Sequence, residues 1–357
     1  MVKVGADSSI WVSGQSIVQQ GTQQYGLGAA FVGQAGFCSK PAGFDPATMR
    51  TYGFFGRLPM VKDLSRYDEE IGSIGKPNDV ETAGGGRVVI YADSVSFEGE
   101  GAKIQANARP YEDFTARRYS LPGGSGGYIY VKTANAHNEN SLEAGSRVEA
   151  RGGYGIGEFT SGSGGVVVFD GGFNVPQDDV HVNGGVSDQD TESGCGNGAA
   201  GTVYRVEEDS LVVDNKGIRL EAATTVAIPE ERQHNSAKGL SELAKKLVVQ
   251  GKANLIIKGE HYGLTFNQLK VFDGSIVEFG QQEDSVNVRF TENAHIAKGA
   301  VLDFTKTKKV MLYQGEVDGQ DTTSRTVIGT VFFRDFLAIK GVNVDIIGNV
   351  RVLGSRS

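Results

Sequence analysis

The sequence predicts an all-β protein, a right-handed parallel β-helix (a solenoid) with one short helix. Three observations lead to this fold class. Glycine supplies 51 of the 357 residues, about twice its ordinary share of ~7%. A glycine-rich segment that leads into a short strand-like run recurs through the middle of the chain. A second, weaker strand-like zone lies between successive copies of this repeat.

The repeat has four copies, aligned here on the last glycine of each glycine-rich segment. These glycines are Gly86, Gly127, Gly165 and Gly201, so the copies are 41, 38 and 36 residues apart. The run after each glycine is short and consists mainly of valine, isoleucine and aromatic residues, which is typical of short strands. A weaker strand-like zone lies between the copies, at residues 102–106, 146–150 and 179–182.

Two strand zones per period indicate two stacked coils of about 20 residues each, with glycine allowing tight corners where the coils meet. Residues 84–205 should then form parallel coils. Alternation and a shared offset from the glycines predict the following inward-facing side chains: Val88, Ile90, Ile104, Ile129, Val148, Val167 and Val203.

By composition the chain divides into three regions. We expect N-terminal glycine-rich coils in residues 1–83, the glycine-rich repeat β-helix in 84–215, and a continued β-solenoid in 216–357. Beyond residue 205 the glycines thin out while strand-like runs continue. One segment differs, because residues 236–247 carry apolar side chains at 240, 243, 244 and 247, the spacing of an amphipathic helix.

Charge and hydropathy exclude several classes of partner. The 43 acidic and 35 basic residues give a net charge of −8, which argues against nucleic acid. No run approaches the ~20 apolar residues of a membrane helix, so no membrane insertion is expected. The first residues lack the apolar core of a secretory signal. The protein is therefore either intracellular or a segment of a longer chain.

Motifs for catalysis are weak. Residues 196–201 match G-x-G-x-x-G, but a strand follows where a dinucleotide site needs a helix, so no cofactor is predicted. The five histidines have no zinc spacing. Because no paired acid and base with a recognisable spacing occurs, no catalytic residue is assigned and the protein is not expected to be an enzyme.

Three features remain open at this stage. The acidic stretch Asp178, Asp179, Asp188, Asp190 and Glu192 is either a solvated turn or a Ca²⁺ site. Cys38 and Cys195 lie about four coils apart, so a disulfide between them is not expected unless the N-terminal segment folds back along the coils. The aromatic groups at residues 52–55, 128–130 and 332–333 either fill the core or form a sugar-binding ladder.

The repeats resemble a known family. The best single match is the run Cys195-Gly196-Asn197-Gly198-Ala199-Ala200-Gly201-Thr202-Val203-Tyr204. Such runs are similar to the G-x-G-S-G-G-x-I-x-I segments of the glycine-rich, large surface proteins of plants and protists. The similar motifs cover roughly residues 8–215. The resemblance implies a membrane-associated or extracellular location and no assigned reaction, although this sequence lacks cysteine-rich modules.

Together these patterns favour a non-enzymatic structural or adhesive protein of a cell surface or an extracellular filament. Strand-like sequence lies close to both ends, at residues 8–12 and 342–347, so we expect self-association or continuation of a longer chain. Glycans are a further candidate partner. Two alternatives stay open: a carbohydrate-active β-helix enzyme (a polysaccharide lyase or glycosidase) and an intracellular scaffold.

Overall fold

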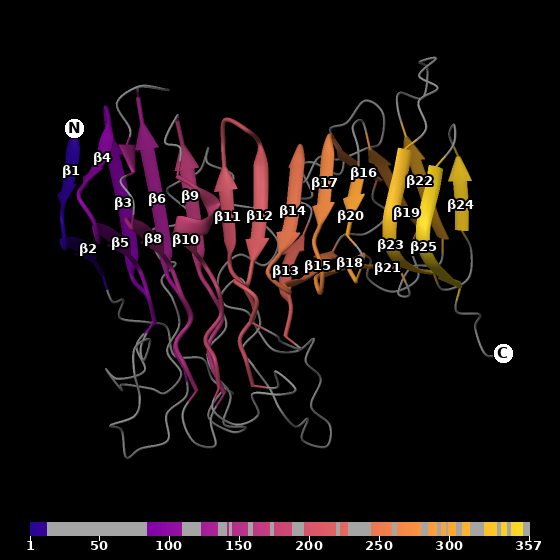
Figure 1. The fold of residues 1–357 in the computed structure, drawn as a ribbon, viewed down its shortest axis with the longest axis horizontal. Coiled ribbons are helices and arrows are strands. Elements are labelled where there is room, and N and C mark those ends of the chain that lie inside the picture. The colour runs from indigo at the N-terminus through magenta and orange to yellow at the C-terminus, as the bar shows by residue number, and fades with distance from the viewer. Residues whose placement is uncertain are drawn as a thin grey trace. The chain divides into compact units, whose positions relative to one another are not determined.

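A computed structural model describes eighteen segments of the chain (Figure 1). They are residues 1–12, 84–108, 123–134, 141–142, 145–155, 160–171, 175–187, 196–218, 222–227, 244–258, 263–279, 285–290, 294–297, 299–304, 309–314, 325–333, 337–340 and 344–352. Within these segments the protein is all-β, with a single 3-10 turn at Gln177–Asp179 and no α-helix. This confirms the predicted all-β character. No helix in these segments has the length and apolar character needed to cross a membrane.

The described residues group into two compact units. Unit 1 holds the chain up to Glu207 together with Val213–Thr224, and unit 2 holds Glu208–Val212 and the chain from Thr225 onward. The strands β12 (Ser210–Asp214) and β13 (Thr224–Ala227) contain residues of both units. The sequence-based boundaries after residues 83 and 215 remain predictions.

Unit 1 contains three sheets of parallel strands. The first sheet has the order β1 (Val2–Gly5), β4 (Val95–Glu98), β7 (Ser141–Leu142). The second has the order β2 (Ser9–Trp11), β5 (Lys103–Gln105), β8 (Arg147–Glu149), β10 (Val180–His181). The third contains β3 (Arg87–Ala92), β6 (Tyr128–Thr133), β9 (Val166–Asp170) and β11 (Thr202–Arg205). The chain visits the sheets in turn, and each return adds a neighbouring strand.

The register of the third sheet follows the glycine repeat. Val88 pairs with Ile129, Ile129 with Val167, and Val167 with Val203. Each period of 41, 38 or 36 residues therefore adds one strand to this sheet. The expectation of two coils per period is wrong in unit 1, because the two strand zones of a period belong to different sheets of the same repeat.

The predicted inward-facing side chains of unit 1 are all buried: Val88, Ile90, Ile104, Ile129, Val148, Val167 and Val203. Tyr128 and Tyr130 are buried as well, which favours packing over an exposed ladder at those two positions. Residues 52–55 lie outside the described segments, and Phe332 and Phe333 are placed only as backbone of β23 (Arg325–Phe333).

The glycine-rich segments form a layer of extended chains, which we call the glycine layer. Residues 123–127, 160–165 and 196–201 precede strands of the third sheet, and residues 106–108, 150–155 and 182–187 follow strands of the second. Backbone hydrogen bonds pass between the two sets. They run from the N–H of Gly153 to Gly124 O (2.8 Å), Gly162 to Gly153 O (2.9 Å), Gly185 to Gly162 O (2.9 Å) and Gly198 to Gly185 O (3.1 Å).

Glycine is required in this layer because backbone meets backbone. A Cβ atom on Gly164 would lie 1.8 Å from the carbonyl oxygen of Val182, and one on Gly185 would lie 1.9 Å from that of Gly153. Neither residue has a positive φ. At these two positions close approach of neighbouring chains, and not turning, excludes a side chain, whereas Gly196 in the same layer does turn, with a φ of 80°.

Polar side chains satisfy the backbone of the last repeat of the layer. Asn215 Oδ1 accepts a hydrogen bond from Gly184 N at 3.0 Å, and its Nδ2 donates to Ile218 O at 3.1 Å. Thr224 Oγ1 donates to Ala200 O at 2.6 Å. Buried N–H and C=O groups of these segments are thus partnered by side chains.

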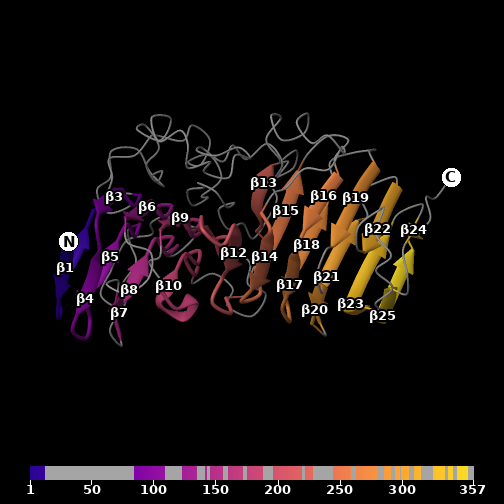
Figure 2. The ribbon, with the colours of Figure 1, turned by 90° about the horizontal axis from the view of Figure 1, so that it is seen from above.

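Unit 2 is built from shorter repeats in three parallel ladders. The first contains β14 (Lys246–Gln250), β17 (Gln268–Val271) and β20 (Ala294–Ile296). The second contains β15 (Asn254–Lys258), β18 (Ile276–Phe279), β21 (Val301–Phe304), β23 and β25 (Val344–Val352). In the third, β16 (Gly263–Phe266), β19 (Ser285–Phe290), β22 (Lys309–Gln314) and β24 (Leu337–Lys340) lie side by side (Figure 2).

The repeat of unit 2 is close to the predicted coil length. Asn254 pairs with Ile276 and Ile276 pairs with Val301, spacings of 22 and 25 residues. The turns before these strands do use the left-handed conformation, with φ of 61° at Lys252, 72° at Gly274 and 88° at Gly299. Glycine suits such turns because it adopts positive φ without strain.

The predicted helix at residues 236–247 is wrong at its C-terminal end. Lys246 and Leu247 belong to β14, and both Leu247 and Val249 are fully buried. Alternate burial in a parallel ladder with β17 outweighs the helical spacing at this end. Residues 236–243 lie outside the described segments.

Candidate functional site

The second sheet of unit 1 carries a row of polar side chains. Ile104, Val148 and Val180 are register partners and are fully buried. The next residues along the strands, Gln105, Glu149 and His181, are also register partners. Because side chains alternate across a strand, this second row lies on the opposite face of the sheet. We call Gln105, Asn107, Glu149, Arg151 and His181 the polar ladder.

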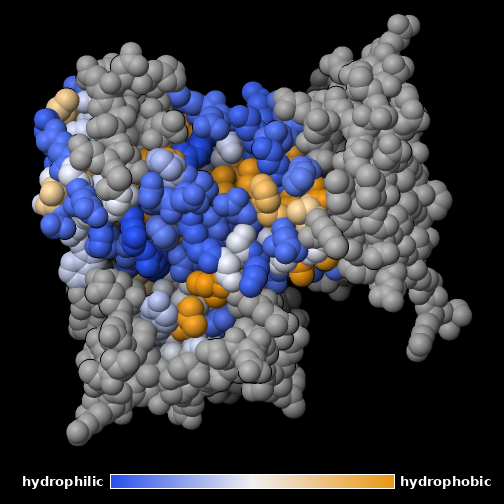
Figure 3. All heavy atoms as spheres, in the orientation of Figure 1, coloured by the Kyte–Doolittle hydropathy of each residue, from blue (hydrophilic) through white to orange (hydrophobic). Residues whose placement is uncertain are grey.

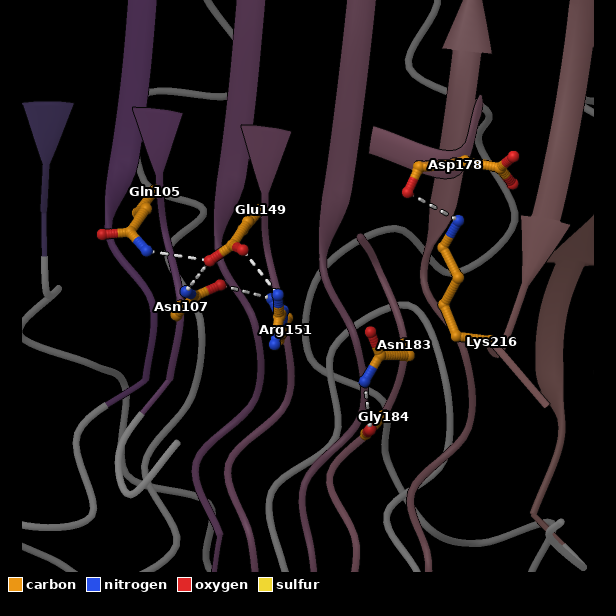
Figure 4. Close-up of polar contacts among 8 residues, drawn as sticks. All are labelled: Gln105, Asn107, Glu149, Arg151, Asp178, Asn183, Gly184 and Lys216. Atoms are coloured by element: carbon orange, nitrogen blue, oxygen red, sulfur yellow. Dashed lines mark hydrogen bonds and ion pairs between the residues drawn. The ribbon is translucent and has the colours of Figure 1, made fainter. Parts of the chain in front are cut away.

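Glu149 is the centre of the polar ladder (Figure 4). It is only 3% exposed. Its Oε2 atom accepts hydrogen bonds from Gln105 Nε2 at 2.8 Å and Asn107 Nδ2 at 2.9 Å, and its Oε1 atom accepts one from Arg151 Nη2. Asn107 Oδ1 accepts the backbone N–H of Arg151 at 2.8 Å. The cluster therefore joins neighbouring repeats through one carboxylate.

The carboxylate of Glu149 is held in its ionised form. Burial raises its pKa, but the adjacent Arg151 guanidinium and the hydrogen bonds from Gln105 and Asn107 outweigh burial, so the pKa is lowered from the ordinary glutamate value. A carboxyl with a lowered pKa carries no proton at neutral pH. Glu149 is thus unsuited to act as a general acid there.

His181 is held in its neutral form. Burial is the main cause, and the cationic Arg151 and Lys216 act in the same direction, so that its pKa falls to about 4. Neither Glu149 nor His181 therefore has a pKa near neutrality, which is where an efficient general acid or base titrates. The polar ladder can orient and bind, but it holds no readily transferable proton at pH 7.

The first two members of the predicted acidic stretch, Asp178 and Asp179, belong to the 3-10 turn. Asp178 lies next to Lys216 (Figure 4). Lys216 Nζ donates to Gln177 O at 2.8 Å and to Asp178 O at 3.4 Å, and it lies 3.1 Å from Asp214 Oδ2. Oxygen atoms of these types are Ca²⁺ ligands in other proteins. Here an ammonium group lies among them, so this set of oxygens already has its cation.

The rest of the acidic stretch is not described. Asp188, Asp190 and Glu192 lie outside the described segments, as does Cys195 and, near the N-terminus, Cys38. In the part of the chain that is described, no three His, Cys, Asp or Glu side chains gather in a way that could hold a metal ion. The Ca²⁺ alternative therefore remains a prediction for the residues around Asp188.

A second polar cluster lies on the third sheet. Tyr130 Oη donates to Asp170 Oδ2 at 2.6 Å, and Lys132 Nζ donates to the same oxygen at 2.9 Å. The ring of Tyr91 lies 5.7 Å from that of Tyr130. Burial and the hydrogen bond to Asp170 raise the pKa of Tyr130 well above the ordinary tyrosine value. This phenol stays protonated and links β6 to β9.

Sequence reasoning assigned no site residues and missed the polar ladder. A signal was present, since a polar residue follows the inward apolar residue in each weaker strand zone: Gln105 after Ile104, Glu149 after Val148, His181 after Val180.

The G-x-G-x-x-G match at residues 196–201 leads into β11, a strand, as predicted. Seen as in Figure 1, the described surface of unit 1 is predominantly hydrophilic (Figure 3).

Comparison of the chain with protein-family models, with curated proteins and with solved structures found no match. The resemblance to glycine-rich surface proteins therefore remains an expectation from the motifs alone. Any account of function has to be argued from the described residues.

Proposed function

We propose that this chain is a non-enzymatic structural or adhesive protein of a cell surface or extracellular filament, folded as a right-handed parallel β-helix. The proposal rests on the hydrogen-bond partners of the buried polar side chains of unit 1. Glu149 is satisfied by groups from its own and a neighbouring repeat, and Tyr130 is satisfied by Asp170 of the next repeat. These side chains stabilise the stacking of repeats.

The strand order supports the β-helix. The chain passes through the three sheets of unit 1 in turn and pairs each strand in parallel with its counterpart in the next repeat. Parallel strands of one sheet need a crossover, and such crossovers are right-handed in about 98% of cases. A right-handed coil is therefore the expected hand.

The protonation states argue against the enzyme alternative at the polar ladder. A glycosidase needs one protonated and one ionised carboxyl group at a defined separation. The ladder has one carboxylate, Glu149, with a lowered pKa, and its neighbour His181 is neutral at pH 7. This arrangement favours a structural role.

Two experiments test the function. The purified chain is incubated with pectate, alginate and a β-glucan, and new reducing ends are measured. We expect none, whereas cleavage that is lost on Asp188→Ala or Glu149→Gln would overturn the proposal in favour of an enzyme. Antibody labelling of intact and permeabilised cells tests location, because a surface protein is labelled in intact cells. Labelling only after permeabilisation would favour an intracellular scaffold.

A pair of cysteines tests the stacking. Lys103 and Arg147 are register partners in the second sheet, 44 residues apart in the chain. Neighbouring strands lie about 4.8 Å apart, within the Cα separation of ~7 Å that a disulfide spans. We expect Lys103→Cys with Arg147→Cys to form a disulfide that peptide mapping identifies. The control Lys103→Cys with Asp179→Cys, which pairs β5 with the residue before β10 across β8, should form none.

A further inference from the structure

We propose that the edge of unit 1 formed by β1, β2 and β3 binds a second copy of this chain. We call this surface the first-repeat edge. The inference rests on the proposed structural function, since it names the partner of a stacked-repeat protein. It is carried by the direction of the backbone polar groups, by exposed side chains at the same strands and by the absence of proline from these strands.

The hydrogen bonds of β3 show which of its backbone groups point outward. Tyr128 N donates to Gly86 O at 2.9 Å, and Ala134 N donates to Ala92 O at 3.1 Å. In a parallel ladder alternate residues face the same neighbour, so Val88 and Ile90, like Gly86 and Ala92, face β6. The N–H and C=O groups of Val89 and Tyr91 therefore point to the other side, where no described strand pairs with β3.

The strands β1 and β2 repeat this arrangement. Val2 N donates to Ser94 O at 2.9 Å, so Val2 and Val4 face β4 and the backbone groups of Lys3 point away from it. Val12 N donates to Gln105 O at 3.1 Å, so Ile10 faces β5 and the backbone groups of Ser9 point away. In the described part of the chain β1 and β2 are the outermost strands of their sheets.

Large exposed apolar side chains gather at the same three strands. Among the side chains whose burial is described, four large apolar ones are exposed, and three of them lie in or next to the strands of the first repeat: Met1 (63% exposed), Trp11 (39%) and Tyr91 (59%). The equivalent position to Tyr91 one strand away is Lys132, and Tyr130 beside it is fully buried. Among the side chains whose burial is described, exposed apolar groups are thus most frequent at the first-repeat edge, as they are at interaction surfaces.

Two of the usual protections of an edge strand are weak in the three described strands. Proteins commonly place lysine or proline on an edge strand to repel another chain. None of the three strands contains proline, and the ammonium group of Lys3 in β1 is paired with the Glu98 carboxylate of β4. The charge of Lys3 is therefore offset within the chain, and the other cation of these strands, the half-buried Arg87, lies at the start of β3.

A second copy is the partner that fits three edges at once. An extended peptide can add a strand to one sheet edge, but it leaves the other two edges open. A partner has to present three parallel strand edges with the spacing of stacked repeats. This chain presents such strands itself, so another copy can satisfy the backbone groups of all three sheets together.

The test is the oligomeric state of the full-length chain over a wide concentration range. Light scattering and sedimentation should show association that grows with concentration. Val89→Pro removes an N–H that points away from β6 and keeps the β3–β6 ladder, because proline is tolerated where the edge faces outward. We expect it to weaken association at least tenfold. The matched control Val89→Thr keeps the N–H and should associate like the parent chain.

A second variant keeps the test decisive if Val89→Pro does not fold. Tyr91→Lys leaves the backbone intact, places a charge at the exposed end of β3 and should weaken association as well. Far-UV circular dichroism identifies the folded variants. A parent chain that stays monomeric at every concentration, or a folded Val89→Pro or Tyr91→Lys protein that associates as the parent does, would overturn the inference. A monomer without polysaccharide cleavage and with surface labelling would leave the proposed function standing.

Discussion

Replacing one glycine of the glycine layer by alanine should destabilise unit 1 far more than such a small change ordinarily does. At Gly201 the new Cβ would lie 1.7 Å from the carbonyl oxygen of Gly165. A carbon and a carbonyl oxygen approach to about 3.3 Å at closest in regular structure, so the two chains have to separate by roughly 1.5 Å. The obstructing atom is backbone, which cannot rotate away.

The magnitude follows from what the separation breaks. Gly201 N donates to Val182 O at 2.6 Å, and Thr202 N donates to Gly165 O at 3.0 Å. Each hydrogen bond contributes about 0.5–1.5 kcal/mol net, and overpacking of a rigid interior costs about 1–3 kcal/mol. We therefore expect Gly201→Ala to lower the free energy of unfolding of unit 1 by about 3–5 kcal/mol.

Two control glycines separate steric clash from backbone conformation. Gly5 has no positive φ, and its nearest contact for a new Cβ is Ser8 Oγ at 3.7 Å, so Gly5→Ala should be neutral or slightly stabilising. Gly217 has open space around it but a φ of 80°. Alanine in that left-handed conformation costs about 1–2 kcal/mol.

The assay is guanidinium unfolding followed by tryptophan fluorescence. Trp11 is the single tryptophan of the sequence and lies in β2, so its signal reports on unit 1. Destabilisation should be smallest for Gly5→Ala, intermediate for Gly217→Ala and largest for Gly201→Ala. If the free energies of unfolding of Gly201→Ala and Gly5→Ala differ by less than about 1 kcal/mol, the argument that backbone contact selects glycine in this layer is refuted.

Three further predictions concern the ionised groups of unit 1. Glu149→Ala should destabilise by about 2–4 kcal/mol in the same assay, because it leaves the buried amides and Arg151 without their acceptor; an effect below 1 kcal/mol would contradict the role given to the polar ladder. The pKa of His181 is depressed in the folded protein, so as the pH falls this histidine is protonated first in the unfolded chain. Stability should therefore fall as the pH drops from 6.5 toward 4. Glu149, whose pKa is also lowered, should add to the loss of stability at still lower pH. Melting temperatures between pH 7 and 5 should therefore fall less in His181→Gln than in the parent chain, and equal slopes would refute this. Lys216→Met should destabilise by about 1–3 kcal/mol because Asp214, whose side chain is 3% exposed, loses its cation, whereas Lys246→Met, which changes a solvent-exposed pair with Glu208, is the control expected to have little effect.

The repeat and the core of unit 1 could be predicted from sequence because both are local patterns. Gly86, Gly127, Gly165 and Gly201 mark the register along the chain, and the strands that follow them pair in that same register. Alternation of apolar residues then identifies the buried positions without knowledge of the neighbours. The same reasoning failed at Leu247, where helical spacing coincides with the alternation of a strand and only the pairing with β17 decides between them.

The role of the glycines and the polar ladder could not be derived in this way, because both depend on which chains are neighbours in space. Gly164 excludes a side chain on account of Val182 O, and Gln105 meets Glu149 across 44 residues of sequence. A second strand zone in each period looks the same whether it starts a new coil or another sheet of the same coil. That choice is made by pairing, which no local pattern contains.

Close packing of main chain against main chain in the glycine layer has a consequence for how this protein can change over evolution. In the sequence, the described segments of the layer are separated by 14, 4 and 8 residues, at positions 109–122, 156–159 and 188–195, yet the segments keep their register. At Gly164, Gly185 and Gly201 an added carbon would meet a carbonyl oxygen, so these positions accept almost no other residue. The register of the layer therefore does not depend on a fixed spacing along the chain, and the constraint falls on individual glycines and not on sequence length.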